Sequence, residues 1–169
     1  MRKILLCLSL GCSLVALAPS AKAQANKKPG LWEVTSTMTF EKSPLPPGMQ
    51  APPGSPFSGA PRTSQVCVTQ AMIDKYGGPS PAPAHGDCQV TNISIKPGGM
   101  TASIVCTGQM AGNGTVEAAF TDANSTQTKV HFAGSMQMGP RSAPVEWTMQ
   151  SNSTFKSADC GSVKPAGSQ

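Results

Sequence analysis

Four cysteines carry the most reactive side chains in the part of this 169-residue chain that follows its first 23 residues. They are Cys67, Cys88, Cys106 and Cys160. No two of them form the closely spaced Cys-x-x-Cys pair that a structural zinc site favours. Four cysteines in an exported chain instead predict two disulfides, with three possible connectivities. We expect Cys67–Cys88, which would close a local excursion, and Cys106–Cys160, which would tie the C-terminal end back to the sheet.

The histidines and carboxylates do not suggest a catalytic site. His85 lies in a proline-rich stretch, and His131 falls on the polar side of an alternating segment. Alternation also places Glu33, Glu117 and Glu146 on solvent-facing sides of their segments. Hydrolytic chemistry needs a nucleophile, a base and an orienting group that converge in one cleft, and the sequence identifies no such set. We therefore expect no enzyme activity and no cofactor.

Methionines offer a weak alternative, a Cu(I) site. Met136 and Met138 are two residues apart, so both would face the same way on a strand, and His131 and Met110 would be nearby. Thioethers are soft ligands that suit Cu(I). However, three other methionines fall on apolar faces, where methionine is an ordinary filler of gaps in a core. These are Met38, Met100 and Met149. We therefore predict no metal site and keep Cu(I) only as a minor alternative.

Residues 1–23 are typical of a cleaved signal peptide. Arg2 and Lys3 precede an apolar run of about 15 residues, which is short for a membrane span, and small residues end the segment. Lipidation at Cys12 is a less favoured reading. Loss of three basic residues leaves ten against eight acidic ones, a net charge of +2, and no basic stripe that would bind nucleic acid. We expect residues 24–169 to be one periplasmic or secreted domain without a transmembrane segment.

Alternating apolar and polar residues predict short β-strands in seven segments, joined by turns at 96–99, 108–114 and 121–125. The segments are 31–40, 64–69, 88–96, 99–107, 115–121, 125–133 and 144–155. Val90 is out of phase, which predicts a bulge or a late start of its strand. The Pro/Gly-rich segment 43–61 is expected to be a loop, and Thr69 and Gly77 would cap a short helix.

These segments predict an all-β fold: an antiparallel meander of about seven to eight strands, one short helix and two disulfides. Gly30-x-Trp32 at the head of the first strand resembles the start of calycin-type barrels. That resemblance implies a sheet curled into an incomplete barrel. The side chains that would then line a ligand cavity are Trp32, Val34, Phe40, Ile104, Phe120, Phe132, Trp147 and Met149.

Several motifs in combination resemble the bacterial exported proteins of domain of unknown function family 3617. They are "PGLWEVTSTM", the proline-rich gap, "QVCVTQAMID", "GDCQV" and "SIVCTG". The resemblance extends from Pro29 to Cys160 and implies a protein of the bacterial cell envelope, without an assigned activity or site.

Two functions follow as hypotheses. The first is a non-enzymatic protein that binds a small apolar or envelope-derived ligand inside the curled sheet. The second is a structural or interaction module of the cell envelope with a fully packed core, because core packing alone would account for the same large apolar residues. A cavity beside Trp32, Phe120 and Trp147 would distinguish them.

Overall fold

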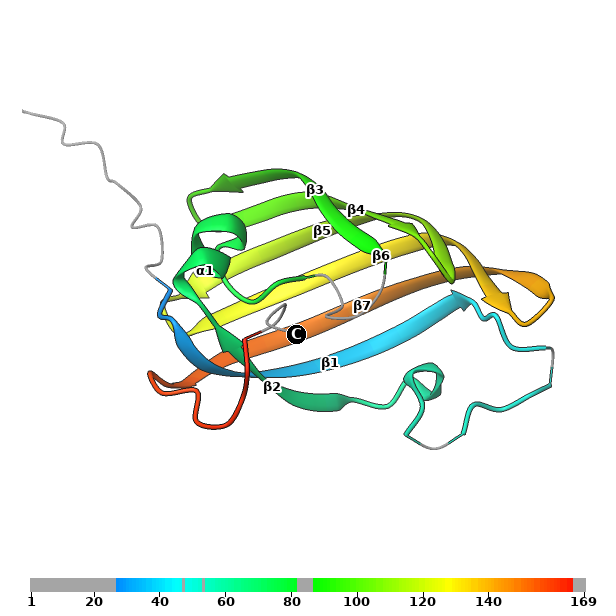
Figure 1. Ribbon diagram of the computed structural model, residues 1–169, viewed down its shortest axis with the longest axis horizontal. Helices are drawn as coiled ribbons and strands as arrows, with labels where there is room; N and C mark the ends of the chain where they lie inside the picture. The colour runs from blue at the N-terminus through cyan, green and yellow to red at the C-terminus, as the bar shows by residue number, and fades with distance from the viewer. Residues whose placement is uncertain (1–26, 47, 53, 82–86, 166–169) are drawn as a thin grey trace, which may run out of the picture.

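The computed structural model describes residues 27–46, 48–52, 54–81 and 87–165. The predicted signal peptide and His85 lie outside this part of the chain. Within it, seven strands, one α-helix and one 3-10 helix are formed (Figure 1). They are β1 (Gly30–Lys42), η1 (Pro56–Ser58), β2 (Arg62–Val68), α1 (Gln70–Tyr76), β3 (Cys88–Lys96), β4 (Gly99–Thr107), β5 (Met110–Asp122), β6 (Ser125–Met138) and β7 (Arg141–Ser157). No helix among these residues is long and apolar enough to cross a membrane.

The strands form a single antiparallel sheet in the order β2-β1-β7-β6-β5-β4-β3. Strands β3 to β6 each pair with the next strand along the chain, and β1 pairs with both β2 and β7. The predicted all-β meander with one short helix and two disulfides is therefore confirmed.

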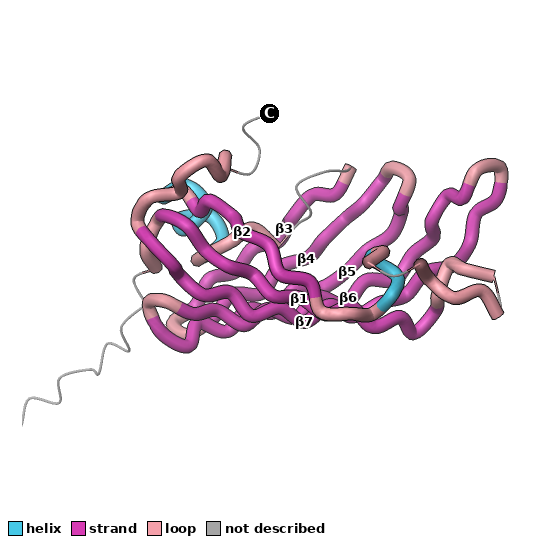
Figure 2. The backbone as a smooth tube through the Cα atoms, turned by 90° about the horizontal axis from the view of Figure 1, so that it is seen from below, coloured by secondary structure: helices cyan, strands magenta, loops and turns pink. Residues whose placement is uncertain are grey.

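The sheet is open, so the expected curl into a calycin-like barrel is wrong. Strands β2 and β3 form the two edges of the sheet and do not pair with each other. The chain that links these edges carries α1, which lies over the sheet in Figures 1 and 2. A meander closes into a barrel only when its edge strands pair. Here the segment between the edges covers part of the apolar face instead.

Local patterns fix the helix and the irregular strand. The Thr69 side chain accepts a hydrogen bond from the Met72 backbone N–H at the start of α1, and Gly77 ends the helix with a φ of 73°. In β3 the register shifts between Thr91 and Ser94, and Asn92 has a φ of 51°. The predicted capped helix and β-bulge are both confirmed.

The predicted turn at 108–114 is too long, because only Gly108 and Gln109 separate β4 from β5. Gly112 and Gly114 belong to β5. A Cβ on Gly112 would lie 2.4 Å from the Ala133 carbonyl oxygen of β6, and its φ is 155°. Glycine therefore permits a close approach of two strands here, which a local pattern cannot distinguish from a turn.

The disulfides join Cys67 to Cys160 and Cys88 to Cys106, so the expected pairing is wrong. Cys88 and Cys106 lie directly opposite each other on β3 and β4, with Cα atoms 4.0 Å apart. Cys67 belongs to β2, at the other edge of the sheet from Cys88, so those two residues cannot meet. Two disulfides are typical of proteins in an oxidising compartment.

One face of the sheet is apolar and contains the core, and a buried lysine closes one end of it. Trp32 is fully buried, and its indole Nε1 donates to the Lys28 carbonyl oxygen at 2.9 Å. The Lys27 Nζ lies 5.7 Å from the centre of the Trp32 ring and donates to the carbonyl oxygens of Asp122, at 2.6 Å, and Ser125. Burial lowers the pKa of Lys27, while the Asp122 carboxylate opposes that shift.

Replacement of Lys27 by methionine is expected to lower the free energy of unfolding by about 1–3 kcal/mol, because two backbone carbonyls lose a charged donor. Lys28→Met is the matched control: Lys28 is exposed, and its loss should change stability by no more than about 0.5 kcal/mol. Urea unfolding monitored by circular dichroism measures both variants. Equal effects would contradict the buried role of Lys27.

Candidate functional site

A groove of about 560 Å³ lies on the apolar face of the sheet. The floor consists of side chains from the strands, and the cover consists of Phe57 from η1, Met72 from α1 and the segment 79–81. Figure 2 shows η1 and α1 on the same side of the sheet. The side chains on one face of the strands thus form the floor of the groove, and residues of the two capped helices, η1 and α1, form part of its cover.

Packed pairs of aromatic side chains form part of the groove wall. Trp147 of β7 lines the groove and stacks on buried Phe132 of β6, with ring centres 5.3 Å apart. Phe40 of β1 packs on Phe57 at 5.5 Å, which ties the Pro/Gly-rich segment to the sheet. Aromatic pairs of this kind contribute about 0.5–1.5 kcal/mol beyond simple burial.

Methionines form the adaptable part of the wall. Five of them line the groove: Met38, Met72, Met110, Met136 and Met149. Met38 lies opposite Met149 across β1 and β7, and Met110 lies opposite Met136 across β5 and β6. The unbranched thioether side chain fits irregular shapes and is common at binding surfaces that accept varied ligands.

Hydroxyl groups from the strands interrupt the apolar floor of the groove, and we call this set the hydroxyl patch. It consists of Ser36, Ser64, Thr128, Ser151 and Ser153. Ser36 lies opposite Ser151, which lies opposite Thr128, so one row of the patch crosses β1, β7 and β6. Serine and threonine hydroxyls both donate and accept hydrogen bonds, so the groove offers polar contacts without charge.

A family model for proteins of unknown function, DUF3617, matches residues 27–160. The chain belongs to the DUF3617 family. The matched region contains all seven strands and α1, and it ends at Cys160, so both disulfides belong to the family region. No curated protein and no solved structure was found to be similar to this DUF3617 protein.

Five of the eight side chains predicted to line a cavity do line the groove: Val34, Phe40, Ile104, Trp147 and Met149. The other three, Trp32, Phe120 and Phe132, are buried but lie outside the lining. Phe120 packs against Gly77 at the end of α1, where a Cβ would come within 2.2 Å of its ring. Gly77 at the end of α1 and Lys27 therefore cover this end of the face, where Trp32 and Phe120 are buried.

Sequence reasoning missed the contributions of Phe57, Met72, Met110, Met136 and the hydroxyl patch. Phe57 and Met72 come from segments that carry no strand pattern, so no local rule places them over the sheet. The patch was detectable: Ser36 shares the alternation phase of Val34 and Met38.

The structure does not bring together all four residues that the sequence suggested for a Cu(I) site. Met110 does lie opposite Met136, but His131 is an odd-numbered residue of β6 and occupies the opposite face. Met138 is 40% exposed and does not line the groove. Among the described residues, no group of three His, Cys, Asp or Glu side chains is placed to hold a metal ion.

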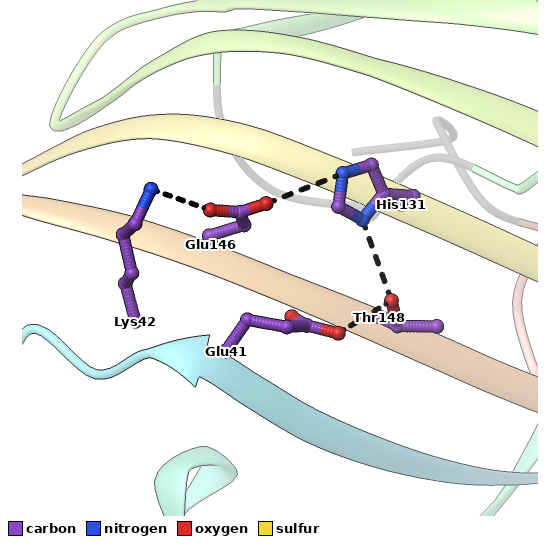
Figure 3. A network of polar contacts seen from close by, with 5 residues as sticks. All are labelled: Glu41, Lys42, His131, Glu146 and Thr148. Atoms are coloured by element: carbon purple, nitrogen blue, oxygen red, sulfur yellow. Dashed lines mark hydrogen bonds and ion pairs between the residues drawn. The ribbon is translucent and has the colours of Figure 1, made fainter.

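His131 instead belongs to a polar network on the other face of the sheet (Figure 3). The His131 Nε2 lies 3.7 Å from a carboxylate oxygen of Glu146, which also pairs with Lys42 at 2.7 Å. The hydrogen bond from Lys42 lowers the pKa of Glu146 and raises that of Lys42.

In the same network, the Thr148 hydroxyl lies 3.4 Å from the His131 Nδ1 and donates to Glu41 at 2.9 Å. Because that proton goes to a carboxylate, the imidazole is not positioned to activate the hydroxyl as a nucleophile. The network is a partly exposed set of cross-strand pairs, and the groove is the better candidate site.

Proposed function

We propose that this DUF3617 protein is a non-enzymatic, periplasmic or secreted binding protein that holds a small apolar molecule in the groove. The observation that carries the proposal is the groove itself, a hollow of about 560 Å³ on the face where a packed module would have a continuous core. This volume is within the range of about 300–1,000 Å³ for ligand sites.

The composition of the lining supports an apolar ligand. Aromatic, aliphatic and methionine side chains dominate it, and none of the described residues that line the groove is charged. A hollow of about 690 Å³ on the opposite face makes a useful contrast, since the charged residues Lys96, Glu117 and Lys129 line it. Burial of apolar surface is the main source of affinity available in the groove, at about 25 cal/mol per Å².

The location follows from independent features. Two disulfides favour an oxidising compartment, and the N-terminal segment resembles a signal peptide. A carrier or sensor of apolar molecules in the cell envelope would work in such a compartment.

Titration with the fluorescent apolar probe N-phenyl-1-naphthylamine tests the proposal. The probe should bind the oxidised protein with a blue-shifted emission. Ser36→Phe places a ring in the groove and should weaken binding at least 10-fold. Thr37→Phe is the matched control, because Thr37 is the next residue of β1 and faces the opposite side.

Both variants should keep the wild-type circular dichroism spectrum. Absence of probe binding by the wild-type protein would refute the proposed function. So would equal loss of binding in the Ser36 and Thr37 variants, because the site would then lie elsewhere or depend only on general stability.

A further inference from the structure

We infer that the ligand is an uncharged amphiphile whose hydroxyl or carbonyl oxygen lies on the hydroxyl patch while its apolar chain runs along the methionines and aromatic rings. This inference rests on the proposed function and names the ligand class. It depends on three features of the groove: the order of polar and apolar residue rows along it, the lack of hydrogen-bond partners for its hydroxyls, and the lack of charged side chains among its described lining residues.

The strand register separates polar rows from apolar rows. Val34 and Ser153 lie opposite each other, and the next row along β1 pairs Ser36 with Ser151. Two further rows follow: Met38 opposite Met149, then Phe40 opposite Trp147. The hydroxyls therefore gather at one end of the groove, and the large apolar side chains continue from there in one direction. A molecule with one polar end and one apolar chain matches this order.

The hydroxyls of the patch have no hydrogen-bond partner among the described residues. Ser151 and Ser153 lie on a central strand and are 8% and 4% exposed. Among the described residues, no hydrogen bond joins the hydroxyls of the patch to another group. The buried Thr126 Oγ1, on the residue opposite Ser153, has no hydrogen-bond partner there either. Buried polar groups are normally paired, because an unpaired one is destabilising. Thr126 Oγ1 is the one atom of this kind among the described residues, so the unpaired hydroxyls of Ser151 and Ser153 are accessible from the groove, where a ligand can bond to them.

The lining also selects against a charged ligand. A carboxylate or phosphate in an apolar groove needs a cation close by, and no lysine or arginine in the described part of the chain lines this groove. Arg62 lies opposite Ser36 on the edge strand β2, but it is exposed and outside the lining. An uncharged oxygen can be satisfied by hydroxyls alone.

The test compares three ligands of similar length on the oxidised protein by displacement of N-phenyl-1-naphthylamine. They are decan-1-ol, its near-isostere undecane, and decanoate. The double variant Ser151→Ala/Ser153→Ala should bind decan-1-ol about 5- to 10-fold more weakly than the wild type, as expected for loss of a hydrogen bond. Its affinities for undecane and for the fluorescent probe should not change.

The melting temperature of the ligand-free double variant should stay close to that of the wild type, because removal of these hydroxyls breaks no hydrogen bond within the described residues. Asn152→Ala is the matched control, because Asn152 is exposed and lies between the two serines on the opposite face; it should change none of the affinities. Equal weakening of decan-1-ol and undecane, or no weakening of decan-1-ol, would overturn the inference. Tighter binding of decanoate than of decan-1-ol would also overturn it and would assign the head group to Arg62. Binding of the probe without any of these selective effects would leave the proposed function intact.

Discussion

Replacing both Cys67 and Cys160 by serine is expected to lower the free energy of unfolding by about 4–5 kcal/mol. The two residues are 93 positions apart, so their disulfide restricts a long loop in the unfolded chain. Chain entropy alone gives a loss of this size for a loop of about 90 residues. The disulfide also holds the C-terminal segment beside the edge strand β2, where Pro165 forms a bridge with Cys67. Guanidinium unfolding under oxidising conditions measures the change.

The second disulfide provides the comparison. Cys88 and Cys106 are only 18 positions apart, and Cys88→Ser/Cys106→Ser should lower stability by about 3 kcal/mol. Thiol titration identifies the pairs directly. Cys67→Ser alone should release one free thiol at Cys160. Release of the thiol at Cys88 in that variant would contradict the observed pairing and restore the one expected from sequence.

Trp32→Ala is expected to lower the free energy of unfolding by about 3–5 kcal/mol, the usual range when a large aromatic core side chain is removed. The ring is fully buried, packs edge-on against Phe155 with ring centres 5.8 Å apart, and lies beneath the Lys27 ammonium. The hydrogen bond from its indole nitrogen to the Lys28 carbonyl oxygen is lost as well. Thermal and urea unfolding both report this loss.

Trp32→Phe separates the contribution of ring packing from that of the indole hydrogen bond, because it retains an aromatic ring but no N–H donor. It should lose clearly less stability than Trp32→Ala. Because Trp32 does not line the groove, folded Trp32→Phe protein should bind N-phenyl-1-naphthylamine like the wild type. A loss below about 1 kcal/mol in Trp32→Ala would contradict its place in the core.

Local chemistry in the sequence predicts much of this fold. The bounds of β4 follow from alternation alone, and the turn at Pro97 and Gly98 follows from the Lys-Pro-Gly-Gly motif. Thr69 and Gly77 mark the ends of α1 because caps depend only on neighbouring residues.

The errors concern contacts between distant segments. Whether Cys67 meets Cys88 or Cys160 depends on which strands form the edges of the sheet, and no local pattern specifies that order. Closure of the sheet into a barrel likewise depends on whether the two edge strands pair, which no local pattern specifies. A glycine such as Gly112 is equally compatible with a turn and with a close approach of two strands. Only the position of the neighbouring strand β6 shows that Gly112 belongs to β5.

In the candidate site, too, local patterns were predictable from the sequence and contacts between distant segments were not. Alternation placed Val34, Phe40 and Trp147 on one face, and all three line the groove. It could not show that α1 and η1 would cover parts of that face and leave a hollow between them. For this reason Phe120 is part of the packed core and Met136 lines the groove, although both side chains lie on the same face of neighbouring strands.

The most direct test of ligand binding in the groove is a nuclear magnetic resonance titration of protein labelled with ¹³C at the methionine methyl groups, using decan-1-ol. The methionines form a built-in comparison. The five that line the groove should shift: Met38, Met72, Met110, Met136 and Met149. The exposed Met49 and Met138 should stay unchanged. Shifts confined to Met49 and Met138, or no shifts at saturating decan-1-ol, would contradict a binding site in the groove.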